Sequence, residues 1–325
     1  MKVIIKLLKN PTSLSGIILL IIFFIVALAA PFFAPVPKNS RDPYMIPRDG
    51  FATEPRPPSE KHILGTTEGQ YDIYYGVIWG TRTAFRIGVV ITFVTTIVGL
   101  FIGSISAFYG GWLDELLMRI TEIFQAFPFL LAAITLTSVL QTIYGRGEAG
   151  SLMLLAKILA FLTFGQSFTK NVDPVQLQIL TGMLAIIFFG WMTYARVIRG
   201  NILSVREYEY ALAARTIGAS DMRILFRHLL PNAVFPVLVI ASMDIGSYVL
   251  TFAALSFLGL GAQRGYADWG QMISFARNWI PSLAKFWYIV VYPGTAIVLF
   301  VLAWNLVGDA LRDILDPRLR GKGGV

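Results

Sequence analysis

Cysteine is absent from this chain of 325 residues, and charged residues are scarce, at 14%. The lack of cysteine excludes disulfide bonds and thiolate-ligated metal sites. A soluble globular domain carries about 25% charged residues, whereas here 56% of the residues are hydrophobic. The composition therefore indicates an integral membrane protein.

Motifs for catalysis and for nucleotide binding are also missing. The segment Gly321-Lys322-Gly323 lacks the GxxxxGK[ST] spacing and the preceding strand of a phosphate-binding loop. Only two histidines are present, and no metal-ligand motif or serine and histidine pair lies in an apolar run, which argues against a membrane-embedded enzyme. The net charge of +8 comes without the basic and aromatic clusters of nucleic-acid-binding proteins. We expect no catalytic residues, no metal, no cofactor and no nucleic acid on this chain.

Long charge-free runs dominate the sequence, and a helix needs about 20 apolar residues to cross a bilayer. A further apolar run, from His228 to Gln263, is interrupted only by Asp244 and predicts a helix followed by a re-entrant or interfacial turn. The segment from Ser151 to Gly165 is short, so we expect an interfacial or partly buried helix there. The sequence thus predicts an all-α integral membrane protein with about six spans, the other five lying between Lys9 and Lys38, Arg86 and Asp114, Glu122 and Arg146, Asp173 and Arg196, and Lys285 and Asp309.

The first span has a competing interpretation as a cleaved signal peptide, since Ala27, Leu28 and Ala29 resemble a cleavage site. Its apolar region exceeds the usual 7 to 15 residues, which favours a retained helix. An even number of spans puts both termini on one side, and the basic loop from Arg196 to Arg227 favours the cytoplasm. We therefore divide the chain into a cytoplasmic N-terminus with the first span (1–34), a proline-rich extracytoplasmic loop (35–82), a transmembrane domain (83–312) with an inner loop (205–232), and a cytoplasmic tail (313–325).

The inner loop is polar and basic, yet it contains good helix formers. Glu207 to Ile217 favours a helix, Gly218 can adopt the left-handed conformation that ends it, Ser220 can cap a second helix, and Pro231 is expected to stop that second helix. Ala213, Ala214 and Gly218 leave a patch without bulky side chains. This patch predicts either a surface that another protein approaches closely or simple packing on neighbouring helices.

Several motifs carry a resemblance to a known family. Within the inner loop, LAARTIG (Leu212 to Gly218) resembles the EAA loop of binding-protein-dependent ABC permeases, although Leu212 replaces the family's glutamate and Glu209 lies one turn earlier. Four further segments are similar to the second permease subunit type of the dipeptide and oligopeptide branch: RHLLPN (227–232), LSFLGLG (255–261), ADWGQM (267–272) and GDALRDILDPRLRG (308–321).

This resemblance implies a type I ABC importer (MetI-like) transmembrane domain that forms half of a pore for peptides or similar oligomers. The expected partners are a second homologous permease, two ATPase subunits that hold Mg-ATP, an extracytoplasmic solute-binding protein, and the lipid of a prokaryotic plasma membrane. The substrates of this branch include dipeptides, oligopeptides, nickel complexes and oligosaccharides, and the sequence leaves the choice open. The loop residues that the resemblance assigns to ATPase coupling are Glu209, Ala213, Ala214, Arg215, Gly218, Ala219, Pro231 and Asn232.

Asp244 lies inside a predicted span, where an acidic residue costs about 2.5 to 3.5 kcal/mol by insertion scales. It is a candidate for the translocation pathway, and an inter-helix hydrogen bond explains it equally well. An ion-gradient-driven secondary transporter is the main alternative function. Such proteins show inverted repeats and broken helices with intramembrane charges, of which Asp244 is the one sign here.

Overall fold

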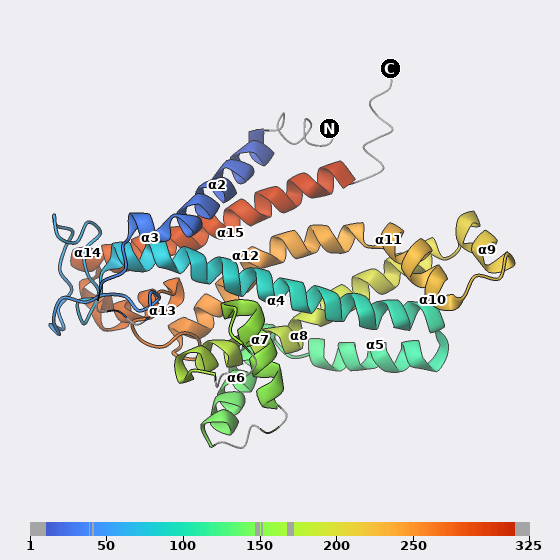
Figure 1. The fold of residues 1–325 in the computed structure, drawn as a ribbon, viewed down its shortest axis with the longest axis horizontal. Coiled ribbons are helices and arrows are strands. Elements are labelled where there is room, and N and C mark those ends of the chain that lie inside the picture. The colour runs from blue at the N-terminus through green and yellow to red at the C-terminus, as the bar shows by residue number, and fades with distance from the viewer. Residues whose placement is uncertain are drawn as a thin grey trace.

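The computed structural model describes residues 11–38, 40, 42–146, 150, 152–167 and 172–315. In these ranges five helices are long and apolar enough to cross a bilayer, or six if the bent pair α5 (Gly111–Gln125) and α6 (Phe129–Gly145) counts as one span. The predicted all-α membrane fold with about six spans is confirmed. The five helices pack lengthwise in a bundle (Figure 1): α2 (Pro11–Leu28), α4 (Ile73–Tyr109), α8 (Pro174–Val205), α12 (Phe235–Phe257) and α15 (Tyr288–Leu315).

The centre of the bundle is the long contact between α4 and α8, with α12 against α15 and α2 on α15. Two glycines of α4, Gly99 and Gly103, lie where α8 passes. A Cβ atom on Gly99 would come within 2.6 Å of the Trp191 carbonyl oxygen, and one on Gly103 would overlap the backbone of Ala195. The absence of these side chains therefore permits the close approach of the two helices.

One end of the bundle carries the proline-rich loop. Residues 42–72 have no helix and are held by isolated β-bridges, such as Met45 to Tyr266, while α3 (Ala30–Phe33) precedes them. The helix α4 begins at Ile73, ten residues before the predicted start of the transmembrane domain, because the Asp72 side chain caps it by accepting from the Tyr75 N–H at 2.8 Å. The same end holds α13 (Trp269–Ser274), the 3₁₀-helix η2 (Phe275–Ser282) and α14 (Leu283–Phe286).

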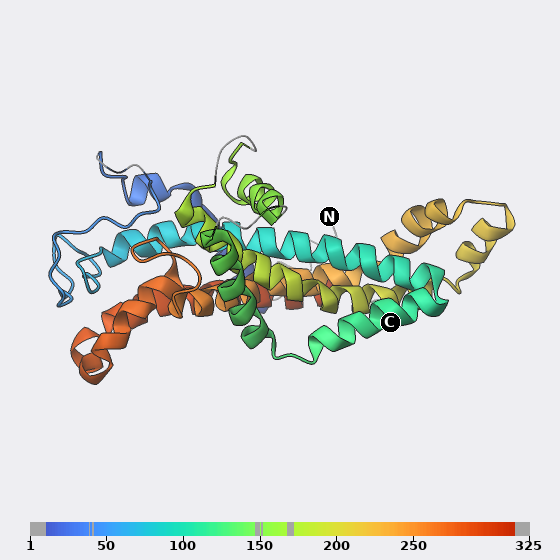
Figure 2. The same cartoon turned by 90° about the horizontal axis from the view of Figure 1, so that it is seen from below.

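The third predicted span is not straight. α5 and α6 are bent by 89° at a short break, and Figure 2 shows the green α6 leaving α5 at a steep angle. Pro128 is the N-cap residue of α6, and a proline disfavours helical backbone at the residue before it, here Phe127. The next helix, α7 (Leu152–Phe164), buries Ala156, Leu159 and Ala160, which confirms the prediction of a short, partly buried helix.

The inner-loop segment lies at the opposite end of the bundle from residues 42–72 (Figures 1 and 2). It consists of α9 (Glu209–Thr216), α10 (Asp221–Arg223), the π-helix η1 (Ile224–Leu229) and α11 (Leu230–Ala233). The first residue of α2 and the last residues of α15 also point away from the proline-rich loop. Both ends of the described chain are thus directed toward the side of the bundle that carries α9.

Candidate functional site

The helix α9 ends at a glycine, as the sequence predicts. Gly218 has φ +76°, and the N–H of Ala219 donates to the Ala214 carbonyl at 3.1 Å while that of Ile217 donates to Ala213 at 3.1 Å. The bond from Ala219 to Ala214 spans six residues around a left-handed glycine, as in a Schellman ending. A Cβ on Gly218 would meet no atom within 4 Å, so the glycine is required by the backbone conformation and not by crowding.

The predicted patch of small residues is divided between two faces of α9. Ala214 is buried in the same apolar cluster as Ile224 and Leu225 of η1, whereas Ala213 and Gly218 are exposed. Ile217, beside them, is 83% exposed. Ala214 therefore packs on the protein, as the second interpretation expects, whereas the approach of another protein to the open face with Ala213 and Gly218 stays a prediction. Glu209 is also exposed and Ala219 is half-buried, while the side chain of Arg215 lies outside the described part of the structure.

The prediction that Pro231 stops the second helix is wrong. The Leu230 N–H bonds to the Leu225 carbonyl, five residues back, and helical bonding continues from Val234 to Leu230 at 3.0 Å. In a π-turn the N–H bonds to the carbonyl five residues back and not four, so the hydrogen-bond register shifts by one residue. A proline, which has no N–H to donate, can stand where this shift interrupts the regular series of bonds. Asn232 is exposed and donates to the His228 carbonyl at 2.7 Å.

Strong contacts join this end of α8 to its neighbours. Arg199 makes a bidentate pair with Asp114 of α5, with Nε to Oδ1 at 2.6 Å and Nη2 to Oδ2 at 2.5 Å, and Ser106 of α4 also bonds Asp114. Asn201 of α8 donates to the Ala233 carbonyl at 3.1 Å. A bidentate arginine fork fixes orientation as well as distance. The helix that leads into α9 is therefore held rigidly to α4, α5 and α11.

Asp244, on α12, has one hydrogen-bond donor from another helix. The hydroxyl of Tyr194 on α8 donates to its Oδ2 at 2.6 Å, and Tyr194 is fully buried. Asp244 itself is half-buried. Asp244 thus makes an inter-helix hydrogen bond, as one of the two expectations states, and its partner is a tyrosine. Tyr194 was missed from the sequence because an aromatic residue in an apolar run gives no polar signal.

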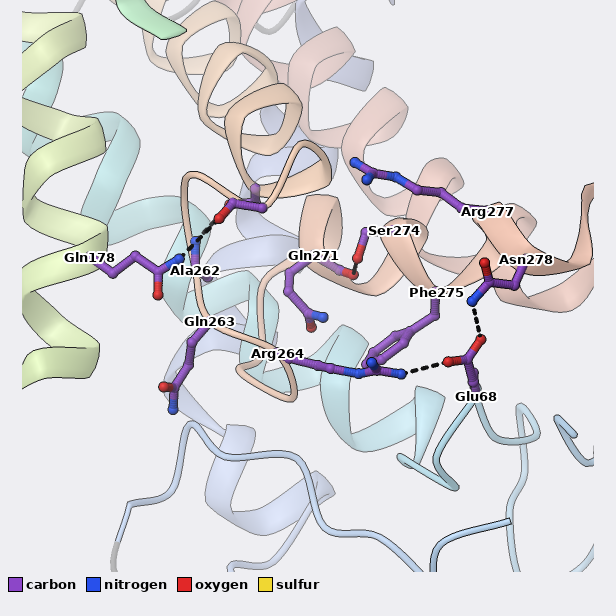
Figure 3. Close-up of a pocket in the computed structure, with 12 residues that line it drawn as sticks. Glu68, Gln178, Ala262, Gln263, Arg264, Gln271, Ser274, Phe275, Arg277 and Asn278 are labelled. Atoms are coloured by element: carbon purple, nitrogen blue, oxygen red, sulfur yellow. Dashed lines mark hydrogen bonds and ion pairs between the residues drawn. The ribbon is translucent and has the colours of Figure 1, made fainter. Parts of the chain in front are cut away.

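A pocket of about 430 Å³ lies at the end of the bundle that carries the proline-rich loop (Figure 3). Its walls come from the first turns of α8, the end of α12, the loop before α13, the helices α13 and η2, and Glu68. None of these residues was predicted from the sequence to belong to a site. The signal was present, since LSFLGLG contributes Ser256 and Gly259 and ADWGQM contributes Gln271.

The segment ADWGQM is fixed by the carboxyl group of Asp268. Its Oδ1 accepts from the Gln271 N–H at 2.8 Å and caps α13. Burial raises the pKa of Asp268 to about 6, although hydrogen bonds from Gln271 and Ser256 oppose the rise. The buried Asp268 side chain therefore fixes the first turn of α13, and with it the position of Gln271 in the pocket wall.

Comparison with known proteins agrees with these features. Residues 99–321 match the family model described as "Binding-protein-dependent transport system inner membrane component", and residues 2–52 match "N-terminal TM domain of oligopeptide transport permease C". The dipeptide transport system permease protein DppC of Alkalihalophilus pseudofirmus is 31% identical over 97% of this chain and 88% of its own length. The oligopeptide permease OppC of Bacillus subtilis is 32% identical (96% and 87%), and the glutathione permease GsiD of Pectobacterium atrosepticum is 35% identical (81% and 75%).

Proposed function

Because the chain belongs to the family of binding-protein-dependent transport system inner membrane components, we propose that it forms half of the translocation pore of an ATP-driven importer and couples to a separate ATPase through α9. The observation that carries this proposal is the position of α9. It lies at one end of the bundle, with an exposed face around Ala213, Ile217 and Gly218. Ala213 and Gly218 let a partner approach the backbone closely, and the exposed Ile217 offers it an apolar contact.

The coupling mechanism follows from how α9 is connected. α8 leads into α9 from one side, and η1 and α11 lead out of it into α12. When two ATPase subunits close on Mg-ATP, a displacement of α9 reaches both long helices directly, because Arg199 and Asn201 prevent the end of α8 from moving independently. Rigid helices then convey the displacement to the pore as alternating access.

The proposed substrates are peptides, delivered by an extracytoplasmic solute-binding protein into a pore completed by a second homologous permease. The names of the relatives, for dipeptide, oligopeptide and glutathione transport, support this substrate class. Both termini and α9 are assigned to the cytoplasm of a prokaryotic cell, and the proline-rich loop to the outside. ATP hydrolysis is assigned to the ATPase subunits and not to this chain.

The test is purification of the tagged chain in mild detergent, with Gly218→Asp compared with Gly50→Asp. Both glycines have positive φ, +76° and +94°, and neither Cβ would meet an atom within 4 Å. Both variants therefore place a non-glycine residue at positive φ and add one negative charge, at opposite ends of the bundle. We expect the amount of ATPase that copurifies with Gly218→Asp to fall about tenfold or more, while the second permease is retained. A loss of about 1.4 kcal/mol of binding free energy is enough to lower the affinity for the ATPase tenfold.

The Gly50→Asp variant should keep both partners. Full retention of the ATPase by Gly218→Asp would contradict coupling through α9. A wild-type preparation that never contains an ATPase, but takes up substrate on an ion gradient, would instead support a secondary transporter.

A further inference from the structure

The pocket at the outer end of the bundle contains two arginines and one acidic residue in its walls, namely Arg264, Arg277 and Glu68. Glu68 is occupied on both oxygens. Oε1 accepts from Arg264 Nη2 at 2.6 Å, and Oε2 accepts from Asn278 at 2.8 Å and from Trp279 at 3.2 Å. Burial raises the pKa of Glu68, but the hydrogen bonds from Asn278 and Arg264 outweigh it, so the pKa lies below its usual range. Glu68 is ionised and neutralises Arg264.

Arg277 differs from Arg264. Among the described residues no carboxylate lies within 4.0 Å of its guanidinium, which instead lies 4.3 Å over the ring of Phe257. Figure 3 shows this guanidinium directed away from Glu68, toward the α12 side of the pocket. Stacking on an aromatic face holds the planar fork in place while its N–H donors stay free. The pocket therefore has one unbalanced positive charge.

The side-chain amide of Gln178 adds a polar group to the pocket wall. Gln178 of α8 donates from its Nε2 to the Gly259 carbonyl at 3.1 Å. No donor to its side-chain oxygen is recorded among the described residues, which leaves an acceptor for a peptide N–H. A volume of about 430 Å³ is within the usual range for small-molecule pockets, about 300–1,000 Å³.

We propose that this pocket receives the free C-terminal carboxylate of a peptide substrate, with Arg277 as the countercharge. The inference rests on the proposed peptide-import function and deepens it. A bidentate arginine fork matches a carboxylate, and the net positive charge disfavours the peptide's amino terminus. A concave pocket of this size suits the end of a peptide better than an acidic side chain on a docking protein surface, which would need only a shallow contact.

The test uses the complete complex with its partner subunits in lipid nanodiscs, without binding protein. Trialanine and trialanine amide are titrated, and the fluorescence of Trp279, which bonds Glu68 beside the pocket, is isolated by subtracting a Trp279→Phe complex. We expect saturable binding of trialanine that is about tenfold weaker for the amide and about tenfold weaker in Arg277→Gln, because a charge-assisted bond is lost in each case. Arg277→Lys should restore part of the affinity.

The matched control is Arg48→Gln. Arg48 is also exposed, lies at the same end and stacks over a phenylalanine, Phe51, at 4.1 Å, but it is outside the pocket. This variant should bind both probes as the wild type does. Equal affinity for trialanine and its amide, or no effect of Arg277→Gln, would overturn the proposal.

ATP-driven uptake into proteoliposomes with binding protein separates the remaining cases. If Arg277→Gln raises only the concentration of binding protein needed for half-maximal uptake, the carboxylate belongs to that protein and the proposal is wrong. If the wild-type complex imports no peptide at all, the proposed function fails, whereas peptide uptake indifferent to Arg277 contradicts only the pocket assignment.

Discussion

At the scale of single residues, Asp244 shows how a charge is accommodated inside the bundle. Its partner Tyr194 is fully buried, so the hydroxyl bond at 2.6 Å joins α8 to α12 away from bulk water. An acidic side chain inside a membrane protein needs such a partner, because the unpaired charge is costly. The bond accounts for the presence of Asp244 without requiring a role in transport, although its half-exposed position also allows one.

The variants Tyr194→Phe and Asp244→Asn separate these two roles. Tyr194→Phe leaves the carboxylate without its donor, so we expect a loss of about 1–3 kcal/mol and a lower denaturation temperature in detergent. Asp244→Asn retains an acceptor oxygen and should keep wild-type stability. The exposed Tyr109→Phe is the control and should change nothing. Equal denaturation temperatures for the two tyrosine variants would contradict the stabilising role, and unchanged transport by Asp244→Asn would remove it from the pathway.

At the scale of elements, the contact of α4 with α8 depends on the spacing of Gly99 and Gly103, one turn apart. Gly103→Ala adds a single Cβ that overlaps the Ala195 backbone, so the helices must separate. We expect a loss of about 1–3 kcal/mol, as for other overpacked cores. The measurement is thermal denaturation followed by size-exclusion chromatography in detergent.

The control for Gly103→Ala is Gly200→Ala, on α8, where a Cβ would meet no atom within 4 Å. It should stabilise the helix slightly, by about 1 kcal/mol or less, because alanine is the better helix former. Gly103→Ala with wild-type stability would show that the two helices do not meet closely at this point.

The sequence predicts the elements better than their breaks. Charge-free runs locate the spans, and Gly218 marks the end of α9, because both signals are local. The charge-free run after Arg86 does not show that α4 begins at Ile73, because Arg82 and Arg86 lie inside the helix, where their guanidinium groups stack over Trp79 and Tyr44 at 5.1 and 4.7 Å. The two motifs that contribute Ser256 and Gln271 to the pocket are visible in the sequence, but their meeting with Glu68 and Gln178, like the bond from Tyr194 to Asp244, joins residues far apart in the chain and leaves no local pattern.

At the scale of the whole molecule, two helices connect the proposed coupling surface to the pocket that contains Arg277. α8 begins near Gln178 in the pocket wall and leads into α9, and α12 follows α11 and ends near Ser256 of the same pocket. The bond from Tyr194 to Asp244 joins these two helices between their ends. We therefore expect a displacement of α9 to move the α8 and α12 walls of the pocket together.

This arrangement requires the two ends of the bundle to face opposite sides of the membrane. At about 1.5 Å per residue, the 37 residues of α4 span about 55 Å, well beyond a hydrocarbon core of about 30 Å. Since the chain has no cysteine, single cysteines report their side without further engineering. Suitable positions are Phe51 in the proline-rich loop, 75% exposed, and Ile217 beside Gly218.

In intact spheroplasts that lack the ATPase subunits we expect a membrane-impermeant maleimide to label Phe51→Cys and not Ile217→Cys, which should react only after permeabilisation. Val298→Cys, on the outward apolar face of α15, is the control and should stay unlabelled in both conditions, because a thiol in lipid is rarely ionised. Labelling of both loop positions from outside would contradict the assignment of α9 to the cytoplasm, and the proposed coupling with it, since an ATPase fuelled by cytoplasmic ATP must reach α9 from within.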